Sequence, residues 1–462
     1  MKFLKCTFIF FILLSMIQFV DLVHAEQDGE NYYTILLKED GNYKSAEELI
    51  SKYNGEILYS VKEIGVLQVK VKEKDMKKIS HSSIIKNFSN SVRVSDKQPI
   101  YDKNIGELSN SKWDYQWDMK KITNDGESYK IFSGTKNVTV GIIDSGLDQE
   151  HPDLKNNIVF GSKNLVPRNG LRGREPNETG NMHDTNDILG HGTSVAGQIA
   201  ANGLLKGVAP GIGIKSYRVF GGLGGDSIWI MKGIVEAAKD DVDVINLSLG
   251  TYLLDGTYLL NGEKYVGDIA EIEGYKRAIN YAKSLGSVTV AASGNDGLNV
   301  KDNNQMNEFF KMNLDSKDII FEGNVLDIPA SIPDVVTVSS TGPSNEISVF
   351  SNFGEGFTNI TAPGGDLRLL SQYGPETWIK DKLFEKEHIM STTIGGSYSF
   401  KFGTSLAAPK VSATLALIID KYGFKDKPYE AVQFLYKNGV DKQDNNTNFK
   451  PKSLNVYRAV TK

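Results

Sequence analysis

Short apolar segments alternate rapidly with short amphipathic ones between about residues 32 and 94. Strands are expected where the apolar residues alternate or run together, and helices where they recur every three or four positions. On this basis we expect strands at residues 33–37, 56–60, 66–71 and 84–94, and helices at 45–53 and 75–80. The resulting order, β-α-β-β-α-β, is typical of a small ferredoxin-like α+β unit.

A second pattern begins after a polar stretch at residues 95–111, which has the composition of an exposed linker. From there on, almost wholly apolar strands alternate with longer helices. Strands are expected at residues 138–144, 242–249, 288–292 and 335–339, and helices at 227–239, 275–284 and 405–422. Continuous apolar strands separated by helices predict a doubly wound parallel α/β sheet whose ligands bind beyond the carboxyl ends of its strands.

The first 25 residues have the pattern of a secretory signal rather than of a folded element. Lys2 and Lys5 precede an apolar stretch at residues 7–20, and small residues follow at Val23 and Ala25. The alternative, an uncleaved membrane anchor, is disfavoured because the stretch is shorter than the roughly 20 residues that a span requires. We therefore expect cleavage after Ala25, a first unit at residues 26–110 with its linker, and a larger unit at residues 111–462.

Composition and charge narrow the classes of partner. The 462 residues are 40% hydrophobic and 24% charged, with a formal net charge of −5, which is ordinary for a globular protein and disfavours nucleic acid as a partner. Cys6 is the only cysteine and would be removed with the signal, so the exported protein would carry no disulfide. The C-terminal residues resemble no anchor. A monomer secreted by a bacterium is the expectation.

Three segments place reactive side chains where such a sheet holds its active site. Asp144 ends the strand-like segment Gly-Ile-Ile-Asp, His191 lies between two glycines at the start of a helical pattern, and Ser405 opens an apolar helix after Gly-Thr. A serine hydroxyl needs a base to become a nucleophile, histidine supplies one near neutral pH, and a carboxylate orients the imidazole. Each residue alone is equally well a turn or capping residue. Together, in the chain order Asp, His, Ser, they predict a catalytic triad.

These three motifs make the chain resemble the subtilisin-like serine protease family from about residue 113 to residue 460. The resemblance implies that Asn295, in Ser-Gly-Asn-Asp, donates a hydrogen bond to the oxyanion. It implies that Ser248, Leu249 and Gly250 form a substrate-binding strand, with Ser293 and Gly294 as the opposite wall of the specificity pocket. It also implies that the first unit is a prodomain that assists folding and inhibits the enzyme until it is cut off, with the linker as the place of processing.

The resemblance leaves metal binding open. Asp153 matches a calcium ligand of the family, but the same residue commonly caps a turn, and the loop at residues 199–206, which often holds calcium in the family, is short here. No cofactor is expected for catalysis itself. Residues 252–268 and 297–327 are expected to be insertions beside the substrate cleft.

Within the family, the size, the motif context and the insertions most resemble the lantibiotic leader peptidases of the epidermin type. The expected reaction is hydrolysis of a peptide or protein substrate through an acyl-enzyme, with cleavage of a lantibiotic precursor after a basic residue. Acids of the insertions are candidates for attracting that residue: Asp255, Glu263, Asp302, Glu308 and Asp315. The alternatives are a broad degradative protease and, less favoured, a catalytically silent binding protein on the same fold.

Overall fold

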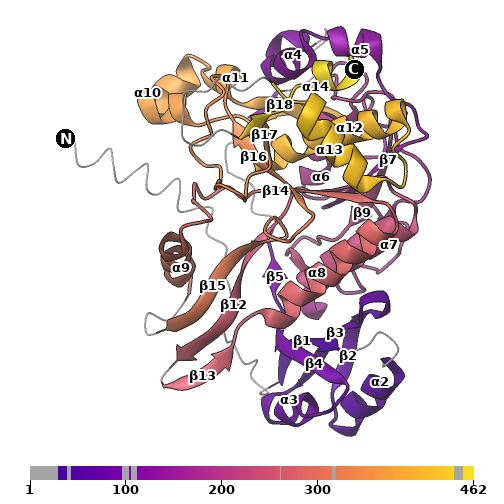
Figure 1. Cartoon of the computed structure of the whole chain (residues 1–462), viewed down its shortest axis with the longest axis vertical. Coiled ribbons are helices and arrows are strands. Elements are labelled where there is room, and N and C mark those ends of the chain that lie inside the picture. The colour runs from indigo at the N-terminus through magenta and orange to yellow at the C-terminus, as the bar shows by residue number, and fades with distance from the viewer. Residues whose placement is uncertain are drawn as a thin grey trace, which may run out of the picture.

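The computed structural model describes residues 30–38, 43–95, 103–105, 112–260, 262–314, 319–441 and 451–462. The expected signal peptide, most of the expected linker and Asp315 lie outside these residues. Two units are visible in Figure 1, a small one formed by the N-terminal part of the chain and a larger α/β body.

The small unit is a four-stranded antiparallel sheet in the order β2-β3-β1-β4, with its two α-helices on one face. Its elements are β1 (Glu30–Leu37), α2 (Tyr43–Lys52), β2 (Glu56–Val61), β3 (Val66–Lys72), α3 (Glu73–Ser80) and β4 (Ile85–Asn90). The β-α-β-β-α-β order agrees with the sequence pattern. Successive residues of β1 face opposite sides, so that Ile35 packs under α2 and α3 while Leu36 joins the core of the larger body.

The strand expected within residues 84–94 is β4, and the chain changes its pairing partner after this strand. After β4, the short strand β5 (Arg93–Val94) leaves the small sheet and pairs antiparallel with β10 (Gly225–Asp226) of the larger body. The expected linker contains a short strand. Residues 103–105 form β6 (Lys103–Ile105), which pairs antiparallel with β19 (Ser397–Lys401).

The larger body is built on an eight-stranded sheet in the order β20-β17-β16-β14-β11-β7-β9-β8, and each pair of neighbouring strands is parallel. Its strands are β7 (Thr139–Asp144), β8 (Lys163–Asn164), β9 (Gly213–Arg218), β11 (Val244–Leu247), β14 (Val288–Ala292), β16 (Val336–Thr341), β17 (Ile360–Pro363) and β20 (Lys452–Ser453). The predicted doubly wound parallel sheet is thereby confirmed. All residues of β7, β11, β14 and β16 are buried, as a sheet covered on both faces requires.

Helices cover both faces of this sheet. One face carries α6 (His191–Ala200) and the long helix α12 (Thr404–Tyr422), and the other carries α7 (Ser227–Lys239) and α8 (Ile269–Ser284). Further helices complete the body: α4 (Trp117–Thr123), α5 (Glu127–Ile131), α10 (Arg368–Lys380), α11 (Phe384–Glu387), α13 (Pro428–Asn438) and α14 (Val456–Val460). No helix in the described ranges is both long enough and apolar enough to cross a membrane.

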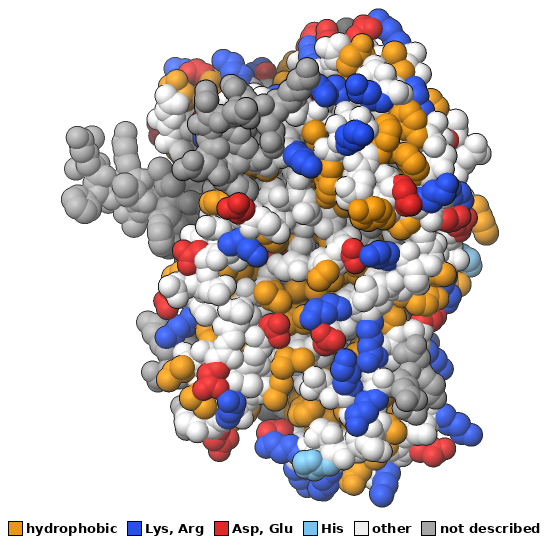
Figure 2. All heavy atoms as spheres, in the orientation of Figure 1, with side chains coloured by type: hydrophobic (Ala, Val, Ile, Leu, Met, Phe, Trp, Pro, Cys, Tyr) orange, Lys and Arg blue, Asp and Glu red, His pale blue; other side chains and the backbone are white. Residues whose placement is uncertain are grey.

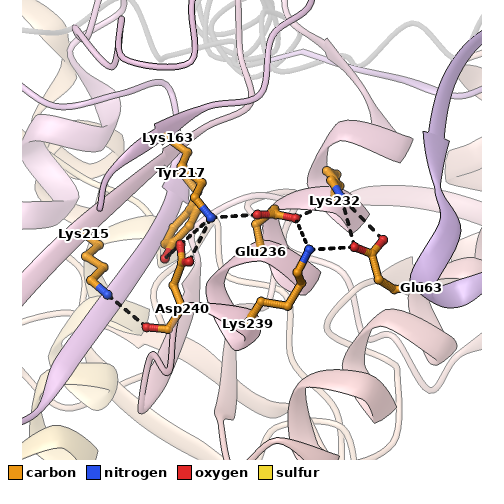
Figure 3. A network of polar contacts seen from close by, with 8 residues as sticks. All are labelled: Glu63, Lys163, Lys215, Tyr217, Lys232, Glu236, Lys239 and Asp240. Atoms are coloured by element: carbon orange, nitrogen blue, oxygen red, sulfur yellow. Dashed lines mark hydrogen bonds and ion pairs between the residues drawn. The ribbon is translucent and has the colours of Figure 1, made fainter. Parts of the chain in front are cut away.

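The small unit packs its open sheet face against α7 and α8. A network of charged side chains extends this contact at its edge, as Figure 3 shows. Glu63 of the small unit contacts Lys232 and Lys239 of α7 at 3.4 and 2.8 Å, and Glu236 lies 2.9 Å from the same lysines. On the face shown in Figure 2, basic and acidic side chains are interspersed.

The two expected insertions form one structure. Strand β12 (Thr251–Leu260) pairs antiparallel with β13 (Glu263–Val266) on one side and with β15 (Ile320–Ile328) on the other, and α9 (Asn303–Met312) packs on β15. This three-stranded sheet, called the inserted sheet below, projects from the larger body beside the small unit (Figure 1).

Candidate active site

Asp144 is the last residue of β7, a central strand of the parallel sheet, and its side chain is fully buried. Its Oδ1 accepts a hydrogen bond from Nδ1 of His191 at 2.7 Å and another from the backbone N–H of Ser145 at 2.7 Å. A carboxylate held in this way fixes the imidazole orientation and stabilises the imidazolium form.

His191 is the first residue of α6, and close backbone packing determines where its ring lies. A Cβ on Gly192 would lie 2.1 Å from the carbonyl oxygen of Gly146, so only glycine allows the start of α6 to approach the segment after β7. Gly190, directly before the helix, has a φ of 82°, which favours glycine as well. The glycines on both sides of His191 therefore bring it against Asp144.

Asp187 is a positioning residue that the sequence reasoning did not identify. Its Oδ1 accepts hydrogen bonds from Gly190 N at 2.7 Å and Ser145 Oγ at 2.8 Å, and its Oδ2 accepts from both N and Oγ1 of Thr193. One carboxylate thus joins the start of α6 to the segment after Asp144. Its position in the sequence could have identified it, since Asp187 lies four residues before a histidine that begins a helix. Helix N-termini favour acidic side chains, which accept hydrogen bonds from the free backbone N–H groups there.

Ser405 lies in the first turn of α12 and lines the same cavity as His191. Its hydroxyl donates to the carbonyl oxygen of Ser248 at 3.1 Å. Gly403, at the helix start, has a φ of 141°, a backbone conformation that glycine tolerates best. Base and hydroxyl are therefore presented to one cavity by the N-termini of two helices on the same face of the sheet.

Asn295 lies beside the start of α12. Its Oδ1 accepts from Thr404 N at 2.8 Å and from Thr404 Oγ1 at 2.9 Å, which leaves Nδ2 as a donor. A Cβ built on Gly403 would be 3.6 Å from this Nδ2 and 3.7 Å from Ser405 N. Asn295 Nδ2 and Ser405 N thus both lie near Gly403 at the start of α12, and two N–H donors placed close to the nucleophile's backbone are able to stabilise an oxyanion.

The expected substrate-binding residues divide into two groups. Ser248, Leu249 and Gly250 follow β11, and all three line the cavity, as does Gly294 after β14. Ser293 does not line it. Because successive residues of an extended chain face opposite sides, the Ser293 side chain is fully buried and donates to the carbonyl oxygen of Asn352 at 2.9 Å.

The N-terminal unit reaches into the same cavity. Val94, which pairs with Gly225 through β5 and β10, and Ser95 both line it. An added antiparallel strand of this kind is how extended peptides bind to a sheet edge.

Asp153 is placed as a loop cap rather than as a member of a ligand cluster. Its two carboxylate oxygens accept from Leu204 N at 3.0 Å and Leu205 N at 2.8 Å, and so hold the short loop after α6. In the described ranges no group of three or more His, Cys, Asp or Glu side chains is arranged to hold a metal ion.

Comparison with known proteins places this site in a family. The model of the subtilase family, peptidase S8, matches residues 135–451. The epidermin leader peptide-processing serine protease EpiP of Staphylococcus epidermidis is 41% identical over 449 residues, which are 94% of this chain and 94% of that protein. The nisin leader peptide-processing serine protease NisP of Lactococcus lactis is 44% identical over 338 residues, which are 73% of this chain but only 48% of that protein.

Solved structures agree with the sequence comparison. The crystal structure of EpiP from Staphylococcus aureus superposes with a TM-score of 0.82 at 40% identity and covers 93% of this chain and 98% of that one. The structure of NisP superposes with a TM-score of 0.70 at 43% identity, over 76% of this chain and 95% of that one. With a family match over most of its length and relatives this similar, the chain belongs to the subtilase family and is a subtilisin-like serine protease.

Proposed function

We propose that the chain is a secreted, monomeric endopeptidase that matures a lantibiotic precursor by cutting its leader after a basic residue. The observation that carries this proposal is one cavity lined by His191, Ser405 and Asn295, with His191 hydrogen-bonded to Asp144, in a chain similar along nearly its whole length to a leader peptide-processing protease.

The chemistry follows from these contacts. Ser405 Oγ attacks the scissile carbonyl carbon while His191 takes its proton, and Asp144 stabilises the imidazolium that forms. The oxyanion of the tetrahedral intermediate is stabilised by Asn295 Nδ2 and Ser405 N. His191 then gives its proton to the leaving amine, and water hydrolyses the acyl-enzyme by the same steps.

The N-terminal unit acts as the enzyme's own inhibitor before maturation. Three observations support this: its sheet packs on α7 and α8, its strand β5 pairs with β10 in the manner of a bound peptide, and Ser95 lines the catalytic cavity. The role of residues 1–25 in export rests on their sequence pattern alone.

The experiment that tests the function offers the mature enzyme a lantibiotic precursor peptide and casein side by side, with the Ser405→Ala variant as the control. Mass spectrometry should find one cut at the leader junction, after a basic residue, and slow digestion of casein. Rapid casein digestion without preference for the junction would favour a broad degradative protease. Absence of cleavage of both substrates would favour the silent binding protein.

A further inference from the structure

The catalytic cavity contains two carboxylates that the mechanism does not use. Asp296 follows Asn295 directly, and Asp327 lies near the end of β15, where the inserted sheet joins the body. Both line the cavity together with Tyr252, which is the direct partner of Asp327 across the β12–β15 pair. The three residues thus lie beside Gly250 and Gly294, the two walls of the specificity pocket.

Only uncharged groups hold the two carboxylates. The Tyr252 hydroxyl donates a hydrogen bond to Oδ2 of Asp296. Nδ2 of Asn352 donates one hydrogen bond to Oδ2 of Asp327 at 2.9 Å and another to the Tyr252 hydroxyl at 2.8 Å. In the described ranges, no basic side chain forms an ion pair with either acid, and the Oδ1 atom of each accepts no hydrogen bond. His191 and Lys401 also line the cavity.

Burial makes this arrangement costly without a cation. The side chain of Asp327 is 2% exposed, and burial together with the neighbouring Asp296 raises its pKa well above the ordinary value. Burial also raises the pKa of Asp296, to about 6, against a smaller opposing effect of the Tyr252 hydrogen bond. Buried carboxylates are normally paired with a cation. A buried Asp327 beside a half-buried Asp296, without a cation between them, therefore indicates that the cation comes from outside the described chain.

The two wall glycines lie close to these acids, and both line the cavity with them. A Cβ on Gly294 would lie 2.4 Å from Asn352 Nδ2 and 2.9 Å from Asp327 Oδ2, and a Cβ on Gly250 would lie 3.4 Å from Asp327 Oδ1. The absence of both Cβ atoms keeps Asp327 accessible between the walls. A long basic side chain entering there would meet two acceptor oxygens, a match for the several N–H groups of a guanidinium.

We propose that Asp327 and Asp296 bind the cationic side chain of the substrate residue whose carbonyl is attacked, and that Tyr252 and Asn352 position them. This assignment rests on the proposed endopeptidase function and names its specificity residues. It also replaces the acids expected from the sequence: Asp255, Glu263, Asp302 and Glu308 do not line the cavity.

The test uses two peptides that differ only in arginine or citrulline at the residue before the scissile bond, because citrulline keeps the shape and loses the charge. The ratio of their kcat/KM values should exceed one in the wild-type enzyme. It should fall about 10–100-fold in Asp327→Asn and in Asp296→Asn, with citrulline cleavage unchanged. Asp255→Asn, an exposed acid on β12, is the matched control and should leave the ratio as it is.

A fluorophosphonate titration counts folded active sites and so separates poor folding of Asp327→Asn from altered specificity. If Asp327→Asn does not fold, the ratio is measured in Asp296→Asn and Tyr252→Phe instead. The assignment would be overturned if the arginine-to-citrulline ratio were unchanged in both Asp296→Asn and a folded Asp327→Asn, or if it were one in the wild-type enzyme. As long as both peptides were cleaved, the endopeptidase function would still stand. Absence of cleavage of either peptide, at any residue, would instead overturn the proposed function.

The pH dependence gives an independent readout. Below pH 6 Asp296 is largely protonated and attracts the cation weakly, so the arginine-to-citrulline ratio should rise as the pH passes through about 6. Ionisation of Asp327, whose pKa is raised well above its ordinary value, should add to this rise. Effects of pH on the chemical step are common to both peptides and cancel in the ratio. A ratio that is flat with pH in the wild-type enzyme would contradict a role for Asp296.

Discussion

Ser405 and Ser248 exchange two hydrogen bonds: the Ser405 hydroxyl donates to the Ser248 carbonyl oxygen at 3.1 Å, and the Ser248 hydroxyl donates to the Ser405 carbonyl oxygen at 2.9 Å. The second bond is available because Pro409, four residues further along α12, has no N–H to donate to the Ser405 carbonyl. The nucleophile is thereby tied to the strand that would bind the substrate. Binding of a substrate N–H to the Ser248 carbonyl would free the Ser405 hydroxyl for His191.

Replacing Ser248 with alanine should lower kcat by about 3–10-fold, because the Ser405 carbonyl loses its only side-chain donor among the described residues. Ser412→Ala is the matched control, since its hydroxyl donates at 2.8 Å to Oδ1 of Asn246, whose Nδ2 contacts the Ser248 hydroxyl, without touching Ser405. The kcat values of the wild type and both variants are measured by steady-state kinetics on a peptide substrate and corrected by active-site titration. An equal loss of kcat in both variants would show a merely structural effect.

Asn295→Ala should lower kcat by about 10²–10³ with little change in KM, a loss like that of the corresponding donor in subtilisin. The reason is that its Nδ2 contributes only once the oxyanion has formed. Thermal unfolding measures the structural cost separately, because Asn295 Oδ1 also accepts from Thr404. A rise in KM at constant kcat would argue against the oxyanion role.

The parallel sheet and the reactive side chains could be predicted from the sequence, because the motifs that indicate them are local. Asp144, His191 and Ser405 each lie in a short motif with glycines, which close backbone packing or a positive φ requires there. The wholly apolar strands indicated a parallel sheet. The pairing of β12 with β15 was not accessible, since these strands are 60 residues apart in the chain and each alone reads as a surface loop. For the same reason Asp296 and Asp327 could not be recognised as neighbours, nor could β5 be separated from β4.

Glu271 of α8 should make the affinity of the larger body for the N-terminal unit depend on pH. It is fully buried and accepts from Thr34 Oγ1 at 2.5 Å and from Val92 N at 3.2 Å, and burial raises its pKa to about 7. Departure of the unit lets the pKa return toward 4.5, so the protonated form favours association. Affinity should therefore be highest below about pH 4.5, fall as the pH rises toward 7, and stay constant above it.

The measurement uses the two units co-expressed as separate chains with Ser405→Ala, and follows dissociation of their complex at pH 5 and pH 8. Release should be on the order of 10–100-fold more favourable at pH 8. Glu271→Gln should remove most of the difference, whereas Glu273→Gln, on the same helix and paired with Lys86 at 3.4 Å, should retain it. Equal pH dependence in wild type and Glu271→Gln would refute this assignment.

Self-cleavage should occur after Lys97. The strands on either side of this part of the chain, β5 and β6, pair with β10 and with β19, and β19 leads directly to the segment that carries Ser405. Lys97 is the only basic residue between them, so a pocket that requires a cation leaves one choice, and the mature chain should begin at Gln98. Lys97→Gln should slow maturation at least 10-fold, whereas the control Lys112→Gln should not slow it. N-terminal sequencing of the mature wild-type protein checks the site, and a start at a residue other than Gln98 would exclude it.

The most direct test of the central claim is the intact mass of the purified wild-type and Ser405→Ala proteins, before and after reaction with a fluorophosphonate. We expect a trimmed wild-type chain with one adduct on the peptide containing Ser405, and a Ser405→Ala chain that keeps its N-terminal unit and gains no mass. Self-trimming of Ser405→Ala in a protease-free sample, or an adduct on any other residue, would contradict it.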